Sequence, residues 1–167
     1  MNRRFAILSA GALLVSAPTV GQSQAAKSSR PAAPTMEALV KSTGEAYKVT
    51  TSGPRTWYVM NMINNGKAAV IALSEERDWL GQAGLAKGRI EVPLISLKAA
   101  PTPQLLKAVA AFNNRLTYGS VIVDESGAYY VHDFFMNGIT TDAIGLEIGV
   151  SFFLAQNAMK EFAAYVE

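Results

Sequence analysis

Asn65 and Gly66 lie between two long runs of strand-forming residues, and they constrain the fold more than any other feature of the chain. The run before them, 55–63, reads RTWYVMNMI, and the run after them, 68–76, reads AAVIALSEE. An Asn-Gly pair suits a two-residue turn because both residues tolerate a positive φ angle, and a turn this short makes the two strands antiparallel. The sheet is therefore predicted to be mainly antiparallel.

A second hairpin is predicted over 118–135, where strand-forming residues flank the turn sequence DESG. Gly127, at the end of that turn, is expected to take a positive φ angle. Pro93 interrupts another predicted strand, 90–98. Because proline has no backbone N–H to donate, it indicates either a sheet edge or a bulge at that strand.

Three helices complete the predicted set of elements. Thr35 and Thr102 can cap a short helix and a longer one, and a final long helix starts at Thr141. The predicted class is α+β, a mainly antiparallel sheet with three helices in the order α-β-β-β-α-β-β-α, within one domain over 35–167. A further short strand is indicated over 46–51.

The first 25 residues have the three parts of a secretory signal peptide. Arg3 and Arg4 supply its positive charge, residues 5–17 form an uncharged apolar stretch, and small residues precede a predicted cut after Ala25. This stretch is shorter than the ~20 residues of a membrane-spanning helix, although a retained anchor stays an alternative. The general secretory route is favoured over twin-arginine export because Phe5 follows the arginines directly.

Residues 26–34 form a predicted disordered leader, because they carry Pro, Ser and Ala without apolar periodicity. The mature protein is expected to be periplasmic or secreted, with no stable membrane insertion once the signal is removed. A lipoprotein anchor is excluded because the chain has no cysteine.

The charge of the mature chain argues against nucleic-acid binding. The whole sequence carries 15 Lys and Arg against 13 Asp and Glu. Two of the 15 are Arg3 and Arg4, so removal of the signal leaves a balanced chain of 13 against 13. A protein that binds nucleic acid depends on clustered positive charge, and none is present here.

His132 is the single histidine of the chain, and Asp133 follows it directly. In a strand, successive side chains point to opposite faces, so His132 shares a face with Tyr130 and Phe134 while Asp133 points away. Asp133 therefore cannot orient the imidazole. A catalytic use of His132 would need a carboxylate from a distant element.

No metal and no cofactor is expected. The chain has no cysteine and one histidine, which removes most metal-ligand sets. Glu75, Glu76 and Asp78 cluster in sequence, but they lack the ligand spacing and the glycine of a calcium loop. Their simplest interpretation is a solvated strand end.

Two groups of side chains are predicted to contact partners. Aromatic side chains offer a large contact area, and those of Tyr and Trp also carry a polar group. The candidate partner surface consists of Trp57, Tyr58, Tyr130, His132 and Phe134. The final helix is apolar on nearly all sides, which indicates burial on more than one side. Its candidate dimer residues are Ile144, Gly145, Ile148, Gly149, Phe152 and Phe153.

The segment 105–148, LLKAVAAFNNRLTYGSVIVDESGAYYVHDFFMNGITTDAIGLEI, resembles the YbjN family of bacterial proteins, which are described as sensory transduction regulators. The shared features are a helix ending in Asn residues, a hairpin with an acidic turn, a Gly after the second strand and a Thr-led final helix. The resemblance extends over 35–166. It implies a fold like that of type III secretion chaperones and a non-enzymatic, often dimeric protein that binds extended protein segments. One departure is the export signal, because family regulators are commonly placed in the cytoplasm.

These observations predict an exported, non-enzymatic, YbjN-like regulator or chaperone-like binder that takes a protein segment or forms a homodimer. A cell-envelope hydrolase or sugar-acting enzyme that uses His132 with a remote carboxylate is the first alternative. A purely structural homodimer is the second.

Export is expected to remove residues 1–25. Intact-mass measurement of the protein recovered from the periplasm should give the mass of residues 26–167. A mass that corresponds to the complete chain would show that the signal is retained.

Overall fold

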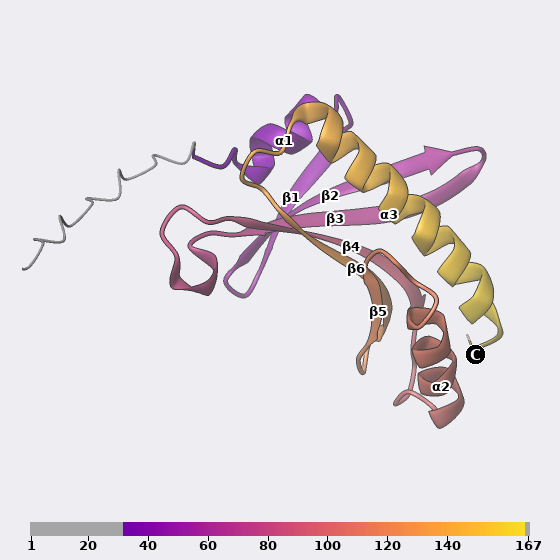
Figure 1. Ribbon diagram of the computed structural model, residues 1–167. Helices are drawn as coiled ribbons and strands as arrows, with labels where there is room; N and C mark the ends of the chain where they lie inside the picture. The colour runs from indigo at the N-terminus through magenta and orange to yellow at the C-terminus, as the bar shows by residue number, and fades with distance from the viewer. Residues whose placement is uncertain (1–31, 166–167) are drawn as a thin grey trace, which may run out of the picture.

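A computed structural model describes residues 32–165 (Figure 1). The predicted signal peptide and the leader up to residue 31 lie outside the described residues. The elements, in chain order, are α1 (Met36–Ser42), β1 (Tyr47–Ser52), β2 (Arg55–Asn64), β3 (Lys67–Glu76), the 3-10 turn η1 (Trp79–Gly81), β4 (Lys87–Ser96), α2 (Pro103–Asn113), β5 (Ser120–Val123), β6 (Gly127–Phe135), α3 (Thr141–Phe162) and the 3-10 turn η2 (Ala163–Tyr165).

The α+β class is confirmed within this range. Six strands form one antiparallel sheet in the order β1-β2-β3-β4-β6-β5. Four strands separate α1 from α2, one more than in the predicted order, because the short segment over 46–51 contributes a full strand, β1. β4 lies inside the sheet between β3 and β6, so Pro93 does not mark an edge. It lies at the register shift between Pro93 and Ile95, which confirms the bulge.

The two hairpin turns differ in the role of their glycines. At the turn between β2 and β3, Asn65 and Gly66 have φ angles of 52° and 74°, as the sequence predicts. Gly127 does not take a positive φ and is instead the first residue of β6. A Cβ atom at Gly127 would collide with the backbone oxygen of Ile95, so glycine is required there for close approach of two strands.

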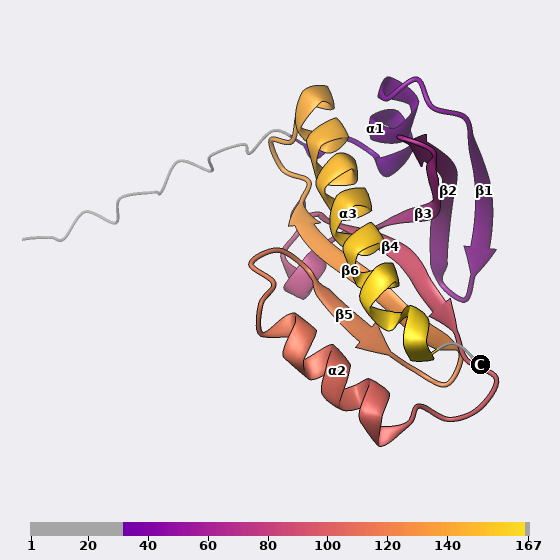
Figure 2. The same cartoon turned by 90° about the vertical axis from the view of Figure 1, so that its right-hand side faces the viewer.

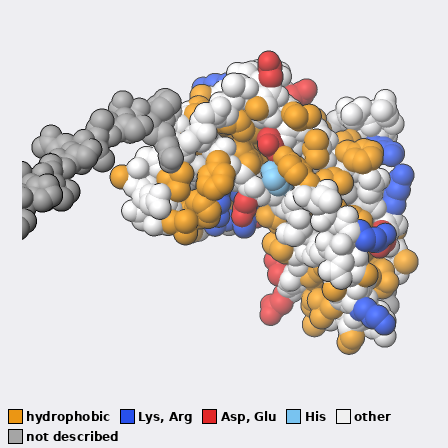
Figure 3. Space-filling model, in the orientation of Figure 1, with side chains coloured by type: hydrophobic (Ala, Val, Ile, Leu, Met, Phe, Trp, Pro, Cys, Tyr) orange, Lys and Arg blue, Asp and Glu red, His pale blue; other side chains and the backbone are white. Residues whose placement is uncertain are grey.

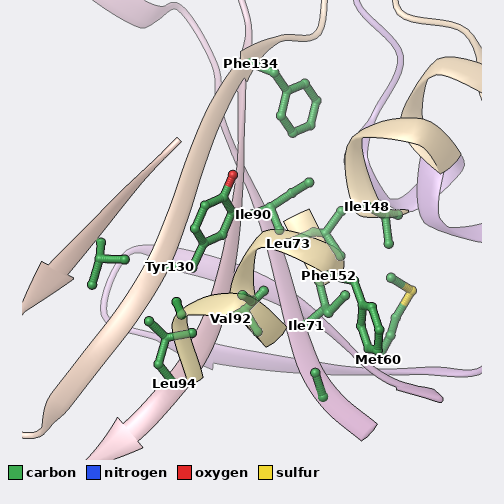
Figure 4. Close-up of a cluster of buried hydrophobic side chains, with 14 of the residues drawn as sticks. Met60, Ile71, Leu73, Ile90, Val92, Leu94, Tyr130, Phe134, Ile148 and Phe152 are labelled. Atoms are coloured by element: carbon green, nitrogen blue, oxygen red, sulfur yellow. The ribbon is translucent and has the colours of Figure 1, made fainter. Parts of the chain in front are cut away.

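The main core lies between α3 and one face of the sheet. α3 crosses β3, β4 and β6, with α1 beside its first turns, and α2 packs beside β5 and the end of α3 (Figures 1 and 2). Alternate residues of the strands point into this layer. Figure 4 shows the side chains that fill it, among them Met60, Ile71, Leu73, Ile90, Val92, Tyr130 and Phe152. In the part of the chain that the structure describes, no α-helix lies on the opposite face, which is formed by the other set of strand residues (Figures 1 and 2).

α3 divides into a buried side and an exposed side. Its N-terminus is capped by Thr140, whose side chain accepts a hydrogen bond from the N–H of Ala143. Ile144, Ile148 and Phe152 are buried against the sheet at the spacing of one helical face. None of the helices in residues 32–165 is long and apolar enough to cross a membrane.

The packed domain begins slightly before the predicted boundary at Thr35. Ala33 is buried, and the Arg77 guanidinium donates hydrogen bonds to the carbonyl oxygens of Ala33 (3.1 Å) and Pro34 (2.8 Å). Glu75 accepts a hydrogen bond from the N–H of Met36 at 2.7 Å and also pairs with Arg77. Glu75 therefore holds the start of α1 on β3, a role that its interpretation as a solvated strand end missed.

Candidate functional site

The two edge strands of the sheet, β1 and β5, differ in how far other parts of the chain cover them. At the β5 edge, the side-chain amide of Asn113 donates to the carbonyl oxygen of Val121 (2.8 Å) and accepts from its N–H (2.7 Å). Asn113 thus occupies backbone groups that another strand would use. Together with α2 beside it, this contact blocks part of the β5 edge.

The β1 edge has no such cover among the described residues. β1 pairs with β2 alone, and all but its first residue are exposed. A two-residue loop, residues 53 and 54, joins β1 to β2, so Ser52 and Arg55 form a hydrogen-bonded pair. Along the hairpin, hydrogen-bonded pairs then alternate with pairs that have no hydrogen bonds between them. It follows that the backbone groups of Tyr47, Val49 and Thr51 point outward, away from β2. β1 therefore offers an extended row of free donors and acceptors.

β1 is also shorter than β2, which leaves the end of β2 uncovered. The first β1 residue, Tyr47, pairs with Met60, so within residues 32–165 no strand pairs with the outer edge of the last residues of β2. Ile63 is 76% exposed there. Figure 1 shows the β2–β3 hairpin extending beyond the rest of the sheet. This part of the molecule exposes both apolar side chains and a free backbone edge.

A groove of about 430 Å³ lies next to this edge, between the end of α1, β2 and the start of α3. Met60 and Met62 of β2 and Ile148 of α3 provide its apolar lining. Its charged lining residues are Glu45 and Asp142, and both are exposed. Its other lining residues are Ser42, Thr43, Thr141 and Gly145. We call this site the α1–α3 groove.

His132 lies in a different place, beneath α3. It is 9% exposed, and its edge is visible in Figure 3 as the single pale-blue patch. Its Nε2 atom is 3.0 Å from Oε2 of Glu147 on α3, and its ring stacks on Tyr118 with the centroids 4.0 Å apart. Burial lowers the pKa of His132, against a smaller opposing effect of Asp133. Burial raises the pKa of Glu147.

Glu147 is the remote carboxylate that a catalytic His132 would need. In a hydrolase triad, however, the imidazole presents one nitrogen to the nucleophile and the other to the acid. Here Nε2, the outer nitrogen, contacts Glu147, and Tyr118 covers the ring face. Ser151, one turn beyond Glu147, is fully buried and its hydroxyl has no hydrogen-bond partner. Nε2 and Oε2 lie close, but neither makes a hydrogen bond among the described residues, so the arrangement favours a structural contact between β6 and α3 over a catalytic one.

Asp133 points to the other face, as alternation predicts. It accepts two hydrogen bonds from Arg89 of β4, at 2.6 Å and 3.0 Å, and lies 3.6 Å from Lys87.

Among the residues from 32 to 165, no group of three or more His, Cys, Asp or Glu side chains could hold a metal ion.

The predicted partner surface does not exist as one surface. Tyr130, His132 and Phe134 do share a face, but that face lies in the core, where Tyr130 is 0% and Phe134 8% exposed. Burial raises the pKa of Tyr130 to about 12, and its hydroxyl donates to the carbonyl oxygen of Tyr118. Trp57 and Tyr58 are half-buried and, as neighbours in β2, lie on opposite faces. Alternation identified the shared face but not which face the helices cover.

The predicted dimer residues also divide into two groups. Ile144, Ile148 and Phe152 belong to the core. Gly145, Gly149 and Phe153 point outward, next to Leu146, and the exposed fractions of Leu146 and Phe153 are 68% and 63%. We call these four residues the α3 stripe. The apolar surface of α3 is thus wider than the part of it that the sheet covers.

Sequence reasoning missed the β1 edge and the α1–α3 groove. The short strand was indicated over 46–51, but its position at the sheet edge depends on the order of the strands. The groove combines residues from α1, β2 and α3 that lie far apart in the chain. Glu45 and Asp142 carried no motif that would have selected them.

No protein-family model matches the chain, and no curated protein matches it either.

The buried position of His132 makes the stability of the protein depend on pH. Because the folded state lowers the pKa of His132, the unfolded chain binds that proton more readily. The free energy of unfolding should therefore fall as pH drops through the ordinary imidazole pKa, about 6.5. Urea denaturation of the wild type and of His132→Gln at pH 7.5 and 5.5 should show a smaller loss in the variant. An equal loss in both proteins would show that His132 does not contribute.

Glu147→Gln is the complementary variant. The raised pKa of Glu147 acts with the opposite sign, because the folded state takes up that proton more readily than the unfolded chain. Removing this group should make stability fall more steeply with decreasing pH than in the wild type.

Proposed function

We propose that the protein is an exported, non-enzymatic binding domain that takes an extended protein segment by strand addition at the outer edge of β1. The observation that carries the proposal is the difference between the two sheet edges. Asn113 occupies backbone groups at the β5 edge, whereas the outward groups of Tyr47, Val49 and Thr51 at the β1 edge are free.

Strand addition suits the chemistry of this edge. An added strand gains main-chain hydrogen bonds, and pockets for alternate side chains provide selectivity. β1 contains no proline and a single charged residue, Lys48, so it has few of the features that protect edge strands from pairing. The neighbouring α1–α3 groove can receive a side chain of the added segment.

This proposal agrees with the resemblance to the YbjN family, whose members are regulators with a chaperone-like fold. The α+β architecture is compatible with that resemblance. The predicted signal peptide supports a binding event in the periplasm or outside the cell, with a segment from a protein of that compartment.

Val49→Pro should abolish strand addition without unfolding β1. The N–H of Val49 points away from β2, so its loss leaves the hairpin intact but removes a donor and adds a ring at the free edge. Short random peptides displayed on phage are selected on the wild type. Their affinity for Val49→Pro should be at least about tenfold lower, because one main-chain hydrogen bond contributes about 1 kcal/mol and the ring also obstructs pairing.

Val49→Ala is the control, because it shortens the same side chain and keeps the N–H. It should bind the selected peptides nearly as the wild type does. Peptides that bind all three proteins equally would place the binding site elsewhere and contradict the proposal.

Self-association through the α3 stripe is a second proposed function. Its support is the exposure of Leu146 and Phe153 beside two glycines that let another backbone approach closely. Exposed apolar patches often mark interfaces, and closed two-fold symmetry is the commonest outcome. A purely structural homodimer is the limiting case, in which a second copy is the only partner.

Gly149→Glu should separate the copies and leave the monomer folded. A Cβ atom at Gly149 meets nothing within 4 Å in the monomer, whereas a carboxylate in the interface would be buried without a partner. Sedimentation velocity at micromolar concentration should show a dimer for the wild type and a monomer for this variant. Ala110→Glu adds the same charge to the exposed side of α2 and should leave the dimer unchanged. A wild type that is monomeric under these conditions would contradict self-association.

The hydrolase alternative has less support. Glu147 supplies the remote carboxylate, but His132 and Ser151 are buried and the imidazole is stacked under Tyr118. The His132→Gln variant described above also tests this alternative, because a hydrolase would lose its activity with that change.

A further inference from the structure

The α1–α3 groove combines an apolar floor with acidic lining groups. Its floor contains the thioether side chains of Met60 and Met62, which adapt to many apolar shapes. Its charged lining groups are two carboxylates, Glu45 at the end of α1 and Asp142 at the start of α3. Among residues 32–165, no basic side chain lines the groove.

Both carboxylates are available to an incoming cation. In the described part of the chain, the structure gives neither Glu45 nor Asp142 an ion pair with a Lys or Arg, so both charges are free to pair with a bound cation. Asp142 lies in the first turn of α3, where the helix dipole favours negative charge. Glu45 lies outside any helix or strand and has no such stabilisation.

Gly145 keeps the groove open. It lies in α3 one turn after Thr141, and a Cβ atom there would meet nothing within 4 Å. Its backbone is ordinary helix, so no strained conformation requires glycine at this position. A glycine in a helix interior costs about 1 kcal/mol relative to alanine. The open space beside α3 therefore comes at a cost in stability, and a larger side chain would fill it.

Lys and Arg side chains match this combination. Their long methylene stems pack on apolar surface while the charged head stays at the rim, where it can reach a carboxylate. Uncharged apolar side chains would leave both carboxylates unpaired, and acidic side chains would be repelled by them.

The position of the groove links it to the edge of β1. Glu45 precedes Tyr47, the first residue of β1, by two residues, and Tyr47 pairs with Met60 on the groove floor. A segment that pairs with the outward groups of Tyr47 and Val49 and continues past the start of β1 would pass the acidic rim. One of its side chains could then enter the groove.

We propose that the α1–α3 groove is the specificity pocket for the bound segment and that it takes a Lys or Arg side chain from that segment. This inference rests on the proposed strand addition at β1. It identifies the partner by its chemistry: an extended protein segment that carries a basic residue among apolar ones.

The experiment compares the peptides that are selected from a displayed random library by the wild type and by Glu45→Lys. The wild type should enrich Lys and Arg over Asp and Glu at one position of the selected peptides. Glu45→Lys, which reverses one of the two charges at the rim, should lose or invert this preference. It should also bind the peptides selected on the wild type about tenfold more weakly, a loss of 1.4 kcal/mol.

A substitution that fills the groove is an independent test of the proposal. Gly145→Phe should lower the affinity of the same peptides by about tenfold or more, because the ring would occupy the space of the basic side chain. Ala110→Phe is the matched control, since it adds the same ring to the exposed side of α2, outside the groove. It should bind as the wild type does.

The outcomes separate this inference from the proposed function. Selected peptides without a basic preference, whose affinity is unchanged in both Glu45→Lys and Gly145→Phe, would overturn the groove proposal. If Val49→Pro still abolished their binding, strand addition at β1 would stand. Peptides that bind Val49→Pro as well as the wild type would contradict strand addition itself.

Discussion

The packing of α3 across β3, β4 and β6 is the contact on which the rest of the structure depends. Ile148 and Phe152 face inner residues of the central strands such as Leu73 and Ile71, in the core that also contains the fully buried Tyr130 (Figure 4). A single helix cannot cover a sheet of six strands, so the outer strands on the β1 side extend past it. The free β1 edge and the α1–α3 groove both follow from this mismatch in width.

The same packing places a polar pair under the helix. His132 on β6 is buried and Glu147 on α3 is half-buried; they lie 3.0 Å apart, and the charged form of each is penalised by loss of water. Because neither Nε2 of His132 nor Oε2 of Glu147 makes a hydrogen bond among the described residues, the pair is a close polar contact whose effect on stability depends on pH.

The proposed binding mode uses the parts of the fold that the core leaves free. Strand addition needs a free backbone row, which β1 supplies, and selectivity needs a nearby pocket, which α1, β2 and α3 form together. The outward side of α3 carries a separate apolar surface at Leu146 and Phe153. Because Gly145 belongs to both the groove and the α3 stripe, self-association and segment binding could compete for the same part of the molecule.

The sequence by itself determined the local elements of this protein. Asn65-Gly66 required a tight turn, Thr102 and Pro103 began a helix, and alternation put His132 and Asp133 on opposite faces, because turn angles, caps and strand pleat depend on neighbouring residues only. Only the tertiary structure decided which strand lies at an edge, which face of β6 is covered, and that Glu75 holds α1. These depend on contacts between residues that are distant in the chain, such as Glu75 with Met36 and His132 with Glu147, and no local pattern encodes them.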